Sequence, residues 1–171
     1  MDLNKARRMI TSTFDGPLRS RGFSEAKRLT FTRGSEDRVE IISFGIRRAN
    51  SDSRSAQFCF SIGIGIRFEA IERVRKNRKA DDQQLFSTIG SPLHLLRPER
   101  TYLEWCFDDL TPPSLDVMSE IDLYALPFFD RYRVIDDVLT ALASEDPMNW
   151  FTLSAAQRGE ILEAISEAKG I

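Results

Sequence analysis

The sequence predicts an α+β protein with an N-terminal helix, an antiparallel β-meander of about four or five strands, and C-terminal helices packed on one face. Two observations carry this prediction. Apolar residues near the N-terminus and in the last third of the chain recur every three or four positions, as on one face of a helix. Between these regions they alternate every second position, as in strands, and short connections favour an antiparallel meander over βαβ units.

The first helix is predicted from an apolar face with spacings of three and four residues: Leu3, Ala6, Ile10, Phe14 and Leu18. Pro17 lies inside this pattern. Because proline lacks the backbone N–H that a helix interior needs, we expect the helix to kink or end near residues 15–16. Gly22 marks the exit from the helix, and Phe23 is expected to pack under its end.

Three strands are predicted next, at residues 29–33, 39–46 and 58–68, with a turn at 34–37 and a polar loop at 47–55. The third strand has the clearest pattern, because every even position from 58 to 68 is large and apolar. The odd positions from 59 to 65 carry small residues instead: Cys59, Ser61, Gly63 and Gly65. One face of this strand therefore belongs to the core, and the other is nearly bare of side chains.

The remaining elements have weaker apolar patterns in the sequence. Residues 69–80 indicate a charged, exposed helix or loop, residues 93–96 a fourth strand, and residues 102–107 a further strand. The chain then looks helical, with interruptions at 126–129 and 146–147, and a capping box at 154–157 opens the last helix. We expect a single α+β domain over residues 1–145 and a C-terminal helical extension over residues 146–171.

Composition favours a soluble cytoplasmic protein. The chain has 171 residues, of which 42% are hydrophobic and 29% charged, as in ordinary globular proteins. Its first residues lack the apolar stretch of a secretory signal, and no apolar run reaches the roughly 18 residues that a membrane helix needs. Cys59 and Cys106 both fall in predicted strands, which favours buried reduced thiols; a bridge between them would require those strands to be adjacent.

The charges are unevenly distributed along the chain. Residues 1–80 hold 18 Lys and Arg against 9 Asp and Glu, whereas residues 81–171 hold 6 against 17. Such a division can indicate nucleic-acid binding by the basic half. The alternative, which the overall net charge of −2 favours, is that the two halves fold against each other and their charges complement internally.

The order of these elements resembles the bacterial domain-of-unknown-function 4304 family. The resemblance rests on Leu18-Arg19-Ser20-Arg21-Gly22-Phe23, residues 58–66, Trp105 and Leu126-Pro127-Phe128-Phe129, and covers about residues 3–142. It departs from the family at residues 61–62, where many relatives carry Asn before the glycine. The resemblance implies an α+β fold and supplies no activity.

The bare face of the strand at 58–68 has two interpretations. Glycine in a strand often marks the close approach of another backbone or of a ligand. In the packing interpretation, a helix or an aromatic side chain covers this face. In the ligand interpretation, Ser61, Gly63 and Gly65 floor a groove, and Arg67 at its end holds an anionic group. Residues 63–68 do not form a dinucleotide fingerprint, because Phe68 stands where a glycine is required.

Two carboxylates join the candidate groove residues. Glu104 and Asp108 lie four apart on one predicted strand face. Paired carboxylates can act as acid and base or bind a cation, and an exposed strand face is the alternative. We expect arginines of the basic half, Arg67 among them, to be their partners.

No catalytic, metal or cofactor site is predicted. His94 is the only histidine, and it lacks the spacing to the two cysteines that metal-binding motifs show. A lone histidine beside a proline and three leucines is more typical of a structural or surface residue than of a catalyst. The sequence thus favours a protein that is not an enzyme.

Three classes of function remain open. The leading one is a non-catalytic, cytoplasmic protein-binding or adaptor module whose partner is another protein, with an immunity-type role as one version. The second is a nucleic-acid-associated protein that uses a basic docking surface: Arg73, Arg75, Lys76, Arg78 and Lys79. The third is a small anionic-ligand binder or enzyme that uses the Gly63/Gly65 face. The oligomeric state is not predicted.

Overall fold

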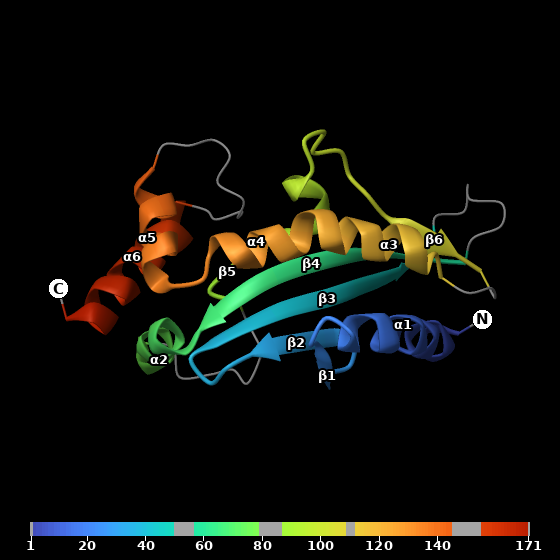
Figure 1. Ribbon diagram of the computed structural model, residues 1–171, viewed down its shortest axis with the longest axis horizontal. Coiled ribbons are helices and arrows are strands. Elements are labelled where there is room, and N and C mark those ends of the chain that lie inside the picture. Colours follow the sequence, from blue (N-terminus) through green and yellow to red (C-terminus); the bar gives the residue numbers. More distant parts are fainter. Residues whose placement is uncertain (1, 50–56, 79–86, 109–111, 145–154, 171) are drawn as a thin grey trace.

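The computed structural model describes residues 2–49, 57–78, 87–108, 112–144 and 155–170. A six-stranded antiparallel sheet forms the centre of the molecule, and two long helical segments run across one of its faces (Figure 1). Three further helices gather at one end of the sheet (Figure 1). The predicted α+β class, with its N-terminal helix, antiparallel meander and C-terminal helices, is confirmed.

The first five strands follow one another in both sequence and space: β1 (Ser24–Lys27), β2 (Thr30–Gly34), β3 (Arg38–Arg48), β4 (Phe58–Phe68) and β5 (Ile89–Pro92). A sixth strand, β6 (Trp105–Phe107), also pairs with β4. Because β3 pairs with the whole length of β4 on one side, β5 and β6 share the other edge, at residues 63–66 and 58–60 respectively. All four side chains of β1 are exposed, so it carries no alternating apolar pattern and was not predicted.

Helix α1 (Leu3–Arg19) begins at Asp2, whose side chain accepts a hydrogen bond of 2.8 Å from the backbone N–H of Lys5. The helix does not end near residues 15–16, one of the two outcomes predicted from Pro17, because it extends to Arg19. Pro17 lies in the last turn, where its missing N–H costs one bond, and the turn closes with Ser20 N–H donating to Gly16 O at 3.1 Å.

A second long helical segment is built from α3 (Ser114–Glu120), a π-helical turn (Ile121–Ala125) and α4 (Leu126–Arg131). The predicted interruption at residues 126–129 is therefore wrong. Pro127 falls in the first turn of α4, and the preceding wide turn changes the hydrogen-bonding pattern before the proline. Helices α5 (Ile135–Ala143) and α6 (Ala155–Lys169) follow; the break at 146–147 and Ser154 of the predicted capping box lie outside the described residues.

Two predictions about the middle of the chain are corrected. Residues 93–96 form a short 3₁₀ helix, and the strand lies just before it as β5. Residues 69–78 form helix α2 (Glu69–Arg78), which is not simply an exposed charged helix. It buries Ile71 and packs against α6, whose own Ile161 and Ile165 are buried. The last helix thus packs on its own chain.

The core lies between the sheet and the two long helical segments. The even-numbered side chains of β4 face it, as the alternation predicted. Aromatic rings fill its centre: Phe14 stacks on Phe44 with ring centroids 4.9 Å apart, and Phe60 stacks on Trp105 at 5.6 Å. Phe23 is buried under the end of α1, where it contacts Phe129 of α4.

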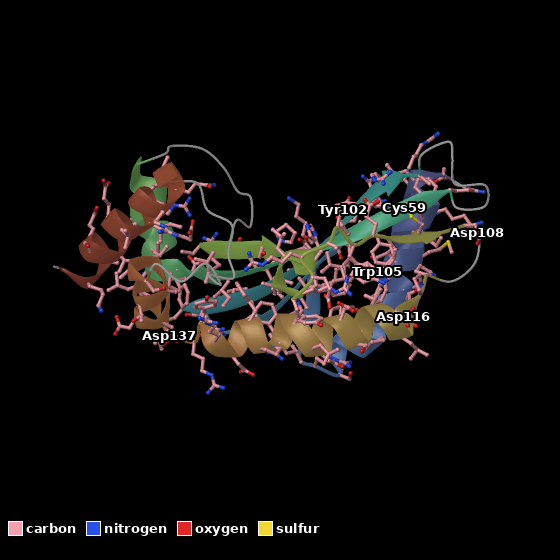
Figure 2. The ribbon with its side chains drawn as sticks, turned by 90° about the horizontal axis from the view of Figure 1, so that it is seen from above. Cys59, Tyr102, Trp105, Asp108, Asp116 and Asp137 are labelled. Atoms are coloured by element: carbon pink, nitrogen blue, oxygen red, sulfur yellow. A yellow bond between two sulfur atoms is a disulfide. The ribbon has the colours of Figure 1, made fainter. Side chains whose placement is uncertain are left out.

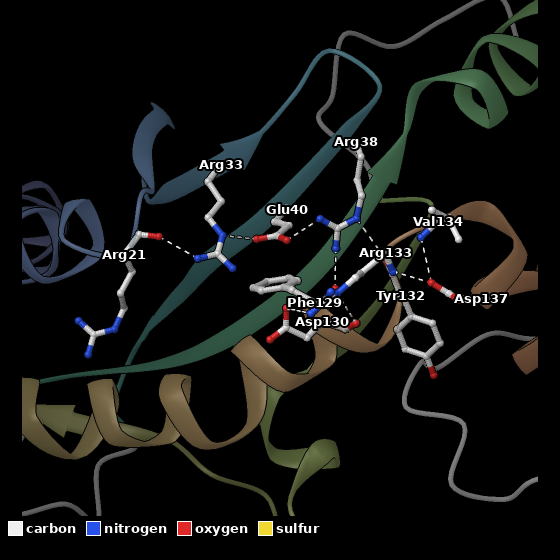
Figure 3. Close-up of polar contacts among 10 residues, drawn as sticks. All are labelled: Arg21, Arg33, Arg38, Glu40, Phe129, Asp130, Tyr132, Arg133, Val134 and Asp137. Carbon is white, nitrogen blue, oxygen red and sulfur yellow. Dashed lines mark hydrogen bonds and ion pairs between the residues drawn. The ribbon is translucent and has the colours of Figure 1, made fainter.

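A polar clamp ties the sheet to the end of α4 (Figure 3). Glu40, which is 6% exposed, accepts hydrogen bonds from both Arg33 and Arg38. Arg38 also donates to the backbone carbonyls of Phe129 and Tyr132, at 2.6 and 3.1 Å. These contacts satisfy carbonyls at the end of α4 and fix the direction in which the chain leaves towards α5.

Cys59 and Cys106 form a disulfide, so the expectation of buried reduced thiols is wrong. The register of β4 and β6 places the two residues directly opposite each other, although 47 positions separate them in sequence. Cys59 is 2% exposed, whereas Cys106 is exposed. The pairing could not be derived from the sequence because it depends on β6 sharing an edge of β4 with β5.

Candidate functional site: a cavity on the small-residue face of the sheet

The face of the sheet opposite the core is lined by small side chains from two neighbouring strands. In the register of β3 and β4, Ser43 lies opposite Gly63, and Ile41 lies opposite Gly65. Gly45 and Ser61 form the next pair along the same face. The bare strip predicted on β4 is thus widened by β3 into a surface two strands across.

This surface floors a cavity of about 490 Å³, a volume typical of small-molecule sites. Ser43, Gly63 and Gly65 belong to its floor, and five residues with hydroxyl groups line it: Thr30, Ser43, Ser87, Thr88 and Ser91. Ser91 pairs with Ile64, so its side chain lies on the core face of the sheet. Helices α2 and α6 supply the remaining wall, through Arg75, Gln157 and Ile161.

The two central glycines have different neighbours. A Cβ on Gly65 would lie 2.6 Å from Ser87 Oγ and 3.1 Å from the carbonyl oxygen of Ile89, so the segment entering β5 lies directly against Gly65. A Cβ on Gly63 would meet only the hydroxyl of Ser43, at 3.0 Å. The packing interpretation therefore holds at Gly65, whereas Gly63 has space for a ligand above it.

The end wall of the cavity is held by a buried hydrogen-bond network. The hydroxyl of Thr88 donates to Glu72 Oε1 at 2.8 Å and accepts from the backbone N–H of Phe68 at 2.9 Å. Arg75 donates to Glu72 at 2.8 Å and to Glu160 at 3.2 Å. This network joins β4, the residue before β5, α2 and α6, so the wall is rigidly attached to the floor.

The same contacts decide the charge of the cavity. Its single lining cation among the described residues, Arg75, lies between two carboxylates, Glu72 and Glu160. The guanidinium charge is thereby balanced within the protein. Other lining groups are hydroxyls, an amide and aliphatic side chains, so the cavity presents hydrogen-bonding groups without a surplus of positive charge.

The structure does not bring the predicted groove residues together. Gly63 and Gly65 lie in the cavity, but Ser61, Arg67, Glu104 and Asp108 are absent from its lining. Arg67 is buried at the end of β4 and pairs with Glu69, the first residue of α2. The predicted pairing of Arg67 with Glu104 or Asp108 is wrong, since β6 pairs with the opposite end of the eleven-residue β4.

Glu104 forms a separate polar cluster beside the disulfide. It accepts from Arg47 Nε at 2.8 Å, and from the hydroxyl of Tyr102. The Arg47 guanidinium holds the pKa of the Glu104 carboxyl below its usual value, and the carboxylate in turn raises the pKa of Tyr102. Cys59, Tyr102 and Asp108 lie at the same end of the molecule, with Asp137 at the other end (Figure 2).

The predicted basic docking surface is only partly described. Arg73 is exposed on α2, whereas Arg75 faces α6 and makes the ion pairs given above. The side chains of Lys76 and Arg78, and all of Lys79, lie outside the described residues. Arg75 therefore belongs to the wall of the cavity and to the contact between helices.

Ion pairs connect the basic half of the chain to the acidic half. Arg21 pairs with Asp122 at 2.5 Å, Arg75 pairs with Glu160, and Arg47 pairs with Glu104. Each of these joins an arginine from residues 1–80 to a carboxylate from residues 81–171. They support the interpretation that the charge asymmetry is complemented inside the fold.

Comparisons with protein-family models, with curated proteins and with solved structures find no match. The resemblance to the domain-of-unknown-function 4304 family therefore stays a prediction. Among the described helices, none is both long enough and apolar enough to cross a bilayer.

The chemistry available in the cavity is hydrogen bonding. His94, the one histidine of the chain, makes an edge-on contact with the ring of Tyr102 and does not line the cavity. The lining hydroxyls thus lack an imidazole base. The sequence gives no sign that Thr30, Ser43, Ser87 and Gln157 belong to the site, because they come from four separate segments. The glycines at positions 63 and 65 are the one signal of the floor that they surround.

Proposed function

We propose that the protein is a non-catalytic binding module that holds an uncharged, hydrogen-bonding small molecule in the cavity over Gly63. The observation that carries this proposal is the cavity itself, which combines a floor of glycine and small side chains with hydroxyl groups along its sides. The hydroxyl of Thr88 is occupied by Glu72 and by the N–H of Phe68, whereas those of Thr30, Ser43 and Ser87 can take part in hydrogen bonds with a ligand. Ile41 and Ile161 supply apolar contact for the body of the ligand.

The charge of the site argues for an uncharged ligand rather than the anion expected from the sequence. Arg67, the residue expected to hold an anion, is buried in a pair with Glu69 outside the cavity. Arg75 is balanced by Glu72 and Glu160. An anion entering the cavity would meet two carboxylates near the one guanidinium, so its desolvation would not be compensated.

The test is a thermal-shift screen of uncharged polyols, sugars and amides, followed by calorimetry on any compound that raises the melting temperature. Gly63→Val should fill the floor of the cavity and abolish that binding. Gly45→Val is the matched control: Gly45 also lies on a central strand, on the same face, with a serine hydroxyl as its nearest neighbour at 3.3 Å, but outside the cavity lining.

The proposal predicts that the two variants melt within a few degrees of each other and that only Gly63→Val loses the ligand. Equal loss of binding in both variants would contradict it, since the effect would then come from the sheet as a whole. Binding that survives Gly63→Val unchanged would place the ligand elsewhere.

A protein partner is a second candidate, and it is supported by exposed apolar side chains on the long helical segment. Leu115 of α3 is 85% exposed and Leu123 of the π-helical turn is 60% exposed. Exposed apolar side chains of this size can contribute to a docking surface. Capture from lysate by the wild type, compared with a Leu115→Ser, Leu123→Ser double variant, tests this candidate; equal capture by both would exclude this surface.

Nuclease treatment of the same samples tests nucleic-acid binding. Arg75 makes ion pairs within the fold, so it adds less positive charge to the surface of the basic segment than the sequence suggests. Captured material that disappears with nuclease, and whose binding weakens steeply with salt, would favour the nucleic-acid alternative over both proposals.

A further inference from the structure

Two cysteines and a carboxylate meet at the end of β4 that lies away from the cavity wall. Cys59 of β4 lies opposite Cys106 of β6, and Glu104 precedes Cys106 by two residues. The sulfur atoms and a carboxylate oxygen of Glu104 all lie within 4.8 Å of one another. The sequence shows no metal-binding motif here, because Cys59 and Cys106 are 47 positions apart.

The carboxylate in this group is held in place by its neighbours. Arg47 lies opposite Cys59 on β3, and its guanidinium donates to both oxygens of Glu104. The hydroxyl of Tyr102 donates to the same carboxylate. Outer partners of this kind orient a ligating group and are a regular part of metal sites.

The charges of the group also suit a divalent cation once the disulfide is opened. Two thiolates and the Glu104 carboxylate carry three negative charges, and Arg47 supplies one positive charge, which leaves a balance of −2 for a cation to neutralise. Two thiolates with one carboxylate form a mixed sulfur and oxygen donor set that suits zinc, with water as a fourth ligand. Because Cys106 is exposed, a cation can reach the group from solvent.

We propose that reduction of the Cys59–Cys106 disulfide creates a binding site for a thiophilic divalent cation of the zinc class, held by both thiolates and Glu104. A dithiol reductant supplies two electrons and two protons, its own sulfurs form a disulfide, and the protein bond becomes two thiols. The entering cation then displaces both thiol protons to solvent. The same two residues thus give a disulfide under oxidising conditions and a metal site under reducing ones.

Cobalt(II) is the probe for this site, because thiolate coordination gives it a charge-transfer absorption band in the ultraviolet. The full chain is reduced with a phosphine, which takes oxygen from water to become the phosphine oxide, and the reagent is removed without air. Titration should give the band at one cobalt ion per chain, and added zinc should displace it. The oxidised protein should give no band.

Variants separate a three-ligand site from adventitious binding by thiols. Glu104→Gln should weaken cobalt binding by about tenfold or more. Asp108→Asn is the matched control, since it removes the same charge two residues beyond Cys106 from a residue outside the cluster, and it should leave the affinity unchanged. Equal affinities of the wild type and Glu104→Gln, or the absence of a thiolate band in the reduced wild type, would overturn the proposal.

Circular dichroism keeps the test decisive if reduction loosens the sheet. A reduced protein that loses its strand signal should regain it on addition of zinc, because the cation would replace the bond between β4 and β6. If zinc does not restore the strand signal, the proposed site is contradicted. The absence of the cobalt band would contradict it in the same way.

Discussion

Gly65 has a packing role that separates it from its neighbour Gly63. The Ser87 hydroxyl and the carbonyl oxygen of Ile89 lie where a Cβ on Gly65 would go. Overpacking of this kind displaces backbone as well as side chains. We expect Gly65→Ala to lower the free energy of unfolding by about 1–3 kcal/mol, measured by urea denaturation.

The control for that prediction is Gly45→Ala, whose added Cβ would meet only a serine hydroxyl at 3.3 Å. We expect it to change stability by less than about 1 kcal/mol, because alanine is also the better strand former. If both substitutions cost the same, the close approach of Ser87 would not be what selects glycine at position 65.

Asp122 offers a prediction about pH. The hydrogen bond from Arg21 lowers the pKa of the Asp122 carboxyl below its ordinary value. Because the folded pKa is below the unfolded one, the pair contributes to stability above about pH 4 and loses its contribution as the pH falls through the folded pKa. Carbon NMR titration should show the low pKa in the wild type and a return towards the ordinary value in Arg21→Met; an equal pKa in both would contradict the assignment.

At the scale of elements, the polar clamp is the feature that positions α4. Glu40→Gln keeps the shape of the side chain but leaves Arg33 and Arg38 close together without a carboxylate between them. Removing one partner of a buried ion pair typically costs about 3–5 kcal/mol, so we expect a large loss of stability, measured by thermal and urea unfolding.

The matched comparison is Asp130→Asn, which breaks an exposed pair with Arg133 in the same part of the molecule. Exposed pairs contribute at most about 1 kcal/mol, so this variant should unfold close to the wild type. A Glu40→Gln variant as stable as Asp130→Asn would mean that the apolar packing of α4, and not the clamp, holds it on the sheet.

The strands and helices that the sequence predicts are those with a strong apolar period. Alternation on β4 and the spacing from Leu3 to Leu18 locate two elements that the structure confirms. β1 was missed because its side chains are all exposed, and residues 93–96 were assigned to the wrong element because a short apolar run fits a strand or a helical turn equally well. Pro127 stands in the first turn of α4, where its missing donor matters least, and Pro17 stands in the last turn of α1, where it removes a single bond.

At the scale of the whole molecule, the disulfide joins segments 47 positions apart. Closing a loop of that length restricts the unfolded chain, and a native disulfide of this kind contributes about 2–4 kcal/mol. We expect reduction in the absence of metal to lower the free energy of unfolding by about this amount. The change should be seen as a lower urea concentration at the midpoint of unfolding. A Cys59→Ala, Cys106→Ala variant should match the reduced wild type; a midpoint unaffected by reduction would show that pairing of β4 with β6 alone sustains this end of the sheet.

The candidate site could be predicted only in part, because it is assembled across the whole fold. The glycines of β4 indicated where a ligand could approach, but the hydroxyls around them come from β2, β3 and the segment before β5. The alternation of strand faces suggested that Arg67 and Glu104 are neighbours. In the structure, Arg67 lies at one end of β4, and Glu104 lies beside the other end, just before β6. The cytoplasmic location also stays a prediction, since a disulfide is more typical of oxidising compartments.

The chain leaves the edge of β4 at β5 and returns to the same edge at β6, after an excursion over residues 93–104. Both ends of that excursion are fixed by pairing with one strand, so its length is not set by the sheet. Doubling such a loop costs only about 0.6 kcal/mol in closure entropy. An exposed point within it, beside Glu99, is therefore a suitable place to graft an epitope or a fluorescent domain, which would tether the molecule to a surface without disturbing the cavity.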